Sequence, residues 1–64
     1  MDIHDHLVIR EAELIAQEMI EKALIEKGFN PREINRRLIE AKALELLADN
    51  PDLFQRAYDK LRRN

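Results

Sequence analysis

Two Asn-Pro pairs, Asn30-Pro31 and Asn50-Pro51, divide a chain of 64 residues that otherwise contains few helix-breaking residues. Asparagine is a favoured N-cap, because its side-chain oxygen accepts a hydrogen bond from the first turn of a helix. Proline suits the first helical position, where its missing N–H is not needed. Gly28, the only glycine, precedes the first pair and can end a helix in the left-handed conformation. Each pair therefore predicts the end of one helix and the start of the next.

Between these breaks the composition is typical of helices, with alanine, leucine, isoleucine, glutamate, arginine and lysine dominant. We predict an all-α fold: a small three-helix bundle with a long first helix, in one domain over residues 1–64. The helices are expected at about 5–27, 31–48 and 51–62, with neighbours antiparallel because the turns are short. A chain of this length buries only about 60% of its unfolded surface. Cysteine is absent, so no disulfide offsets that weakness.

The first predicted helix carries apolar residues on two sides. At about 100° per residue, the main face comprises Val8, Ile9, Ala12, Ile15, Ala16, Met19, Ile20, Ala23 and Leu24. A second stripe, close to the opposite side, comprises Leu7, Leu14 and Ile25. A helix in a simple three-helix monomer needs one apolar face, so the second stripe indicates a surface that another chain covers.

The second predicted helix is apolar around most of its circumference. One side comprises Ile34, Leu38, Ala41, Leu44 and Ala48, and another comprises Ile39, Ala43, Leu46 and Leu47. The candidate interaction residues are Leu7, Leu14, Ile25, Ile39, Leu46 and Leu47. Symmetric homodimers are the commonest way to cover such a surface, so we expect a homodimer, or else docking of an unidentified protein partner. The simpler interpretation is that the extra leucines are scattered surface residues, which need no explanation.

The segment GFNPREINRR, residues 28–37, supports a second hypothesis. Its turn glycine and the arginines Arg32, Arg36 and Arg37 resemble scattered elements of helix-turn-helix DNA-binding proteins. Against this, the preceding helix is long, Arg37 stands where such a motif has an apolar residue, and the net charge is −2 with a pI of about 5.6. Phosphate binding prefers an unopposed basic stripe. Nucleic acid is therefore the alternative partner, with these three arginines as its contacts.

The segment DIHDH, residues 2–6, is the one stretch that looks like metal ligands. Asp2, His4 and His6 would share one side of an extended chain, but on a helix the two histidines lie about 200° apart and cannot share an ion. We interpret the segment as a helix start, and we expect neither a metal nor a cofactor.

Enzyme chemistry has little support in the sequence. Serine, threonine and cysteine are absent, which leaves the phenol of Tyr58 as the only hydroxyl nucleophile. A single glycine cannot form a Gly-rich phosphate loop. We therefore predict a non-enzyme: a small protein-interaction module, acting as a regulator, inhibitor or accessory subunit through apolar helix faces, as a homodimer.

Location follows from the shortness of the apolar runs. Leu7-Val8-Ile9 and Ala23-Leu24-Ile25 are among the longest, whereas a helix that spans a bilayer needs roughly 20 apolar residues. The chain begins Met1-Asp2, unlike a signal peptide. We expect a cytoplasmic protein that does not bind membranes.

Overall fold

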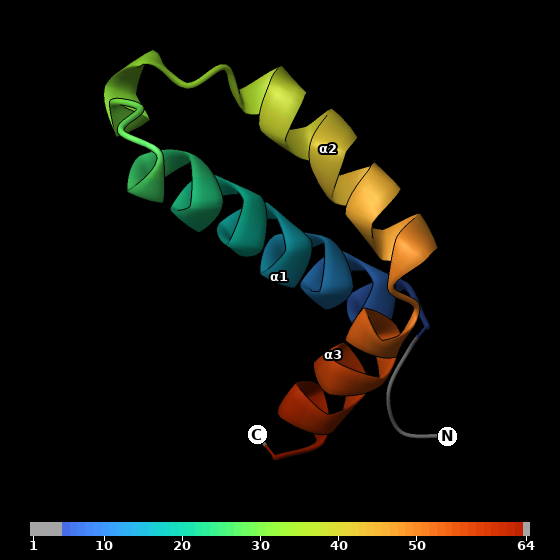
Figure 1. The fold of residues 1–64 in the computed structure, drawn as a ribbon. Coiled ribbons are helices and arrows are strands. Elements are labelled where there is room, and N and C mark those ends of the chain that lie inside the picture. Colours follow the sequence, from blue (N-terminus) through green and yellow to red (C-terminus); the bar gives the residue numbers. More distant parts are fainter. Residues whose placement is uncertain (1–4, 64) are drawn as a thin grey trace.

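A computed structural model describes residues 5–63 and contains three helices (Figure 1). These are α1 (Asp5–Glu26), α2 (Arg36–Asp49) and α3 (Asp52–Arg63), with a 3-10 turn, η1 (Pro31–Glu33), between α1 and α2. No strand occurs within residues 5–63. The prediction of an all-helical chain with a long first helix is confirmed.

The end of α1 is set by Gly28, as the sequence predicts. Gly28 has a φ of 100°, a backbone conformation that side chains with a Cβ rarely adopt. Its N–H donates to the carbonyl of Ile25 at 2.9 Å, and the N–H of Phe29 donates to the carbonyl of Leu24 at 3.1 Å. These two bonds define a Schellman motif, which satisfies carbonyls left open at the helix end.

The first Asn-Pro pair starts a shorter helical element than predicted. The Asn30 side chain accepts from the N–H of Arg32 at 3.0 Å, but only the 3-10 turn η1 follows. The backbone is then extended at Ile34 and Asn35, and the Asn35 side chain caps α2 by accepting from the N–H of Arg37 at 2.9 Å. The predicted start of this helix at residue 31 is therefore wrong, since α2 begins at Arg36.

The second Asn-Pro pair is placed correctly, but Asn50 has a different role. Its backbone N–H donates to the carbonyls of Leu46 and Leu47, and its side-chain Nδ2 donates to the carbonyl of Leu46 at 2.9 Å. Asn50 thus caps the C-terminus of α2, and the predicted side-chain cap on the third helix is wrong. Toward α3, Asn50 contributes only its backbone carbonyl, which accepts a hydrogen bond from the N–H of Leu53 at 3.0 Å.

Both shorter helices pack on α1 (Figure 1). α2 returns alongside α1 in the opposite direction, and α3 lies against its N-terminal half, where Leu53 and Ala57 join Ala12 and Ala16 in the core. α2 and α3 make few contacts with each other. α1 is therefore the common support of the fold.

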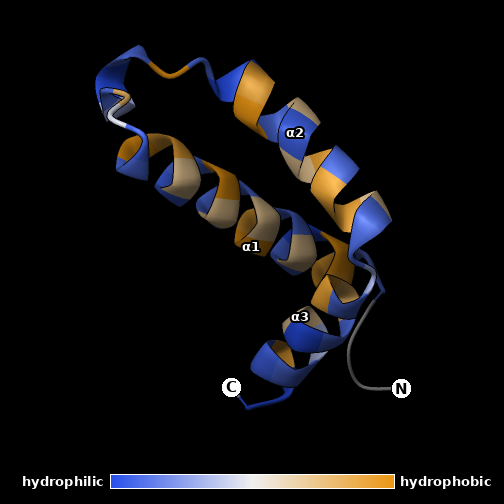
Figure 2. Cartoon of the chain, viewed as in Figure 1, coloured by the Kyte–Doolittle hydropathy of each residue, from blue (hydrophilic) through white to orange (hydrophobic). Residues whose placement is uncertain are grey.

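The core is small and built mainly from alanine. Its buried residues are Ala12, Ala16, Ile39, Ala43, Leu47, Leu53 and Ala57. Alanine lets helix backbones approach closely, but it removes little apolar surface from water compared with leucine or isoleucine. Figure 2 shows further apolar segments along the whole length of α1 and α2.

The molecule is elongated for its length, with principal extents of 41 × 22 × 16 Å. Its radius of gyration is 12.8 Å, whereas a compact domain of this length has about 10.7 Å. Among the described helices, none is both long enough and apolar enough to cross a bilayer.

Candidate interaction surface

The outer stripe of α1 consists of Leu7, Leu14 and Ile25, and the chain leaves all three exposed. Their exposed fractions are 41%, 44% and 43%. The stripe is uncovered because α2 and α3 pack on the face of α1 that carries Ala12 and Ala16. The ion pairs of Glu21 with Arg36 and of Glu11 with Lys60 lie at the borders of the stripe. The first three predicted interaction residues are therefore accessible to a partner.

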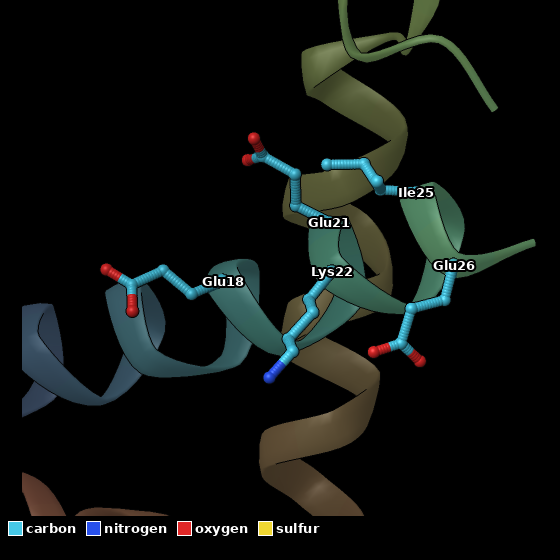
Figure 3. A pocket seen from close by; sticks show the side chains of 5 residues that line it. All are labelled: Glu18, Glu21, Lys22, Ile25 and Glu26. Carbon is cyan, nitrogen blue, oxygen red and sulfur yellow. The ribbon is translucent and has the colours of Figure 1, made fainter. Parts of the chain in front are cut away.

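Charged side chains surround the outer stripe. At its C-terminal end, Ile25 lies in a hollow of about 410 Å³ with Glu18, Glu21, Lys22 and Glu26 (Figure 3). All five residues belong to α1, so the hollow is a dent in one helix surface. Its single apolar side chain and its acidic surroundings favour a partner that brings apolar contacts together with positive charge.

The predicted interaction residues on the second helix lie mostly inside the chain. Ile39 and Leu47 are 1% and 5% exposed, and Leu46 is partly buried against the core. This corrects their assignment as candidate interface residues, because the chain itself covers the face they occupy. Leu38 and Leu44, on the other apolar side of α2, are exposed instead. Sequence periodicity finds both apolar sides but cannot tell which one turns toward α1.

Two large apolar side chains on the main face of α1 are exposed, although helical periodicity predicts them to be buried. Ile9 is 47% exposed and Met19 is 42% exposed. Met19 lies beyond the N-terminal half of α1, which is the part that packs against α3. Because α3 has only 12 residues, it is too short to cover all of α1, and this length could be read from the sequence. Phe29, in the turn after α1, is also exposed.

The three arginines of the DNA hypothesis are exposed, but they do not form one free basic stripe. The Arg36 guanidinium donates to Glu21 Oε2 at 2.9 Å and to Gln17 Oε1 at 3.0 Å. Within residues 5–63, no ion pair involves Arg32 or Arg37. Arg36 thus helps hold α2 on α1, and two arginines remain for an external phosphate.

The contact between α1 and α3 contains the most buried carboxylate among the ion pairs of the described chain. Lys60 Nζ lies 2.9 Å from Glu11 Oε2, and the side chain of Glu11 is only 16% exposed. The hydrogen bond and charge of Glu11 raise the pKa of Lys60 above its ordinary value of 10.5. Glu11 is therefore committed within the chain and is not free to meet a partner.

The metal hypothesis for DIHDH falls partly outside the described residues. His6 lies in the first turn of α1, whereas Asp2 and His4 precede the described range. Among residues 5–63, no group of three or more histidine, cysteine, aspartate or glutamate side chains could hold an ion.

Comparison with known proteins identifies no relative: no family model, no curated protein and no solved structure matches this chain.

Proposed function

We propose that this chain is a small non-enzymatic protein-interaction module, a regulator, inhibitor or accessory subunit, that acts through apolar helix faces as a homodimer. One observation carries the proposal: Leu7, Leu14 and Ile25 are exposed on the outer stripe while the buried core is mainly alanine. Exposed apolar groups gathered on one face mark interaction sites. Isologous dimers are the commonest way for one chain to cover such a face.

The energetics of the single chain support self-association. Burial of a leucine or isoleucine side chain contributes roughly 1.5–3 kcal/mol. Only Ile39, Leu47 and Leu53 among the buried residues are that large, so the monomer has few such contributions to offset its conformational entropy. Burial of the outer stripe in a dimer would add further contributions of this kind.

The shape of the surface supports binding to a macromolecule rather than catalysis. The hollow at Ile25 is formed by one helix and stays open to solvent. Catalytic and small-molecule sites enclose most of their ligand and bring polar groups together from several elements. An extended partner surface, such as a helix, fits this open face better than a small substrate.

Sedimentation equilibrium at micromolar concentration tests the proposal. The natural chain is expected at twice its mass of 7.6 kDa. Leu14→Glu should shift the equilibrium strongly toward monomer, because it places a charge in the apolar contact. Leu44→Glu is the matched control, since Leu44 is exposed on α2 and lies off the outer stripe. A natural chain that sediments only at 7.6 kDa would contradict the homodimer.

Duplex DNA binding through Arg32, Arg36 and Arg37 is the alternative proposal, and it has weaker support. Arg36 is engaged by Glu21 and Gln17, and the net charge of the chain is −2. A DNA-binding role predicts affinity for duplex DNA that falls steeply as salt rises. A protein-interaction module predicts no duplex affinity at physiological salt, so a fluorescence anisotropy titration separates the two.

A further inference from the structure

Leu14 lies at the centre of a charge pattern that is complementary to its own two-fold image. Arg10 precedes Leu14 by one helical turn and Glu18 follows it by one turn, both within α1. Residues four apart lie about 6 Å apart along the helix axis and about 40° apart around it. Arg10 and Glu18 therefore lie on opposite sides of Leu14 along the same outward surface, one positive and one negative.

We propose that a second copy of this chain covers the outer stripe around Leu14, with the two α1 helices antiparallel about a two-fold axis at Leu14, so that Leu7 lies opposite Glu21 of the second copy. This symmetry brings the two Leu14 side chains together and places Arg10 of each copy opposite Glu18 of the other. The arrangement rests on the homodimer proposed above and specifies its geometry. An isologous contact repeats every interaction, so the single complementary pattern yields two ion pairs.

Both charged residues are available for such pairing. Arg10 and Glu18 are exposed, and no ion pair within residues 5–63 involves either of them. Two other acids that border the stripe are already paired, because Glu11 binds Lys60 and Glu21 binds Arg36. Arg10 and Glu18 thus lie on the two sides of Leu14 without an ion pair of their own, where this symmetry needs them.

Other antiparallel registers of the stripe are less favourable. If Leu7 faced Ile25 of the second copy, Arg10 would face Lys22 and Glu11 would face Glu21, with like charges in both pairs. If Leu14 faced Ile25, Glu18 would face Glu21. Like charges placed opposite each other across an interface are destabilising.

One further register, with Leu7 facing Leu14, has a complementary charge pattern. It would pair Arg10 with Glu11 of the second copy. Glu11 is 2.9 Å from Lys60 in its own chain, and its side chain is only 16% exposed. Glu18 forms no ion pair within residues 5–63, so pairing through Glu18 breaks none, and the axis at Leu14 is preferred.

The single chain exposes more surface than a compact monomer of its mass. The whole chain exposes 5217 Å², whereas a compact monomer of 7.6 kDa exposes about 4300 Å². The difference is about 900 Å², and a standard stable interface buries about 800 Å² per partner. A second copy on α1 would reduce this excess.

Two charge reversals test the geometry through their pairing preference. Arg10→Glu alone places glutamate opposite Glu18 twice, and Glu18→Arg alone places Arg10 opposite arginine twice. Each variant should dimerise roughly tenfold more weakly than the natural chain, or weaker still. Mixed together, the two variants regain two opposite-charge pairs. Native mass spectrometry of an equimolar mixture should therefore show more heterodimer than random mixing gives.

The matched control reverses two exposed charges on α2, in Arg37→Glu and Glu45→Arg, and their mixture should pair at random. Variants that dimerise like the natural chain and mix at random would overturn the axis at Leu14 while leaving the homodimer in place. Rescue of Arg10→Glu by Glu11→Arg, rather than by Glu18→Arg, would also overturn it. A natural chain that stays monomeric at micromolar concentration would overturn both the homodimer and its geometry.

Discussion

Gly28 adopts a φ of 100°, and no heavy atom lies within 4 Å of the position that a Cβ would occupy there. The cost of a side chain at this site is therefore backbone strain alone. Gly28→Val should lower the free energy of unfolding by about 1–2 kcal/mol, because a β-branched residue is strained in the left-handed region. Urea denaturation at fixed protein concentration measures the change. Asparagine tolerates the left-handed region better than valine, so Gly28→Asn should lower the free energy of unfolding by clearly less. Equal losses for the two variants would show that backbone strain is not responsible.

Asn30 and Asn35 make the same kind of capping bond on elements of different length. Asn35 caps the 14 residues of α2, whereas Asn30 caps the three residues of η1. Asn35→Ala should therefore cost about 0.5–2 kcal/mol in the free energy of unfolding. Asn30→Ala is the paired control and should cost less. The urea midpoints of the two variants measure both costs. A larger loss of stability for Asn30→Ala than for Asn35→Ala would mean that η1 continues into α2 in solution.

Helix α3 is attached to α1 through small side chains that leave no room for larger ones. Ala57 is fully buried, in one cluster with Ala12 and Ala16. Ala57→Leu should destabilise the fold by about 1–3 kcal/mol, because the extra methylene groups push the helices apart. Ala48→Leu makes the same change at an exposed site of α2 and should have little effect. If both variants melt alike, α3 is not packed against α1 through this seam.

The ion pair between Lys60 and Glu11 gives the contact of α1 with α3 a pH dependence. Folding raises the pKa of Lys60 above 10.5 through the hydrogen bond and charge of Glu11. The protonated form is favoured in the folded state, so this contribution is fully present below the unfolded pKa of lysine. It is lost as the pH rises through the raised pKa of the folded state.

Lys60→Gln removes the titrating group and serves as the reference chain. The difference in urea midpoint between the natural chain and this variant should be constant up to about pH 10 and should shrink above it. A difference that stays unchanged to pH 12 would indicate that the pair adds no stability.

The positions of the helices could be predicted from the sequence because local signals set them. Gly28 ends α1 through its own backbone preference, and the pair Asn50-Pro51 separates α2 from α3. The start of α2 could not be predicted in this way. Asn30-Pro31 and Asn35 both have capping chemistry, and the choice between them depends on how the chain turns to bring α2 back onto α1.

The candidate surface was predictable on α1 and not on α2, for a related reason. On α1 the stripe of Leu7, Leu14 and Ile25 is narrow and well separated from the main apolar face. On α2 the two apolar sides are comparable, and the packing of Ile39 and Leu47 on α1 decides which one is buried. Which side is buried depends on contacts between helices, and these contacts cannot be predicted from helical periodicity.

At the scale of the whole molecule, association should make stability depend on protein concentration. If the folded protomer is stabilised mainly as a dimer, a tenfold increase in concentration should raise the apparent stability by about 1.4 kcal/mol per dimer, or about 0.7 kcal/mol per protomer. Thermal melts followed by circular dichroism over two decades of concentration measure this directly. Leu14→Glu should abolish the dependence, and Leu44→Glu should preserve it. A natural chain whose melting temperature is independent of concentration would indicate that the monomer is stable alone.

The alanine seam between the helices also has a calorimetric consequence. The heat capacity of a protein rises on unfolding mainly because apolar surface meets water, by typically 12–15 cal/mol/K per residue. A core in which Ala12, Ala16, Ala43 and Ala57 hold the central places has little such surface to release. The heat-capacity increment of unfolding of the isolated protomer should therefore lie below this range. Its free energy of unfolding should then curve only weakly with temperature.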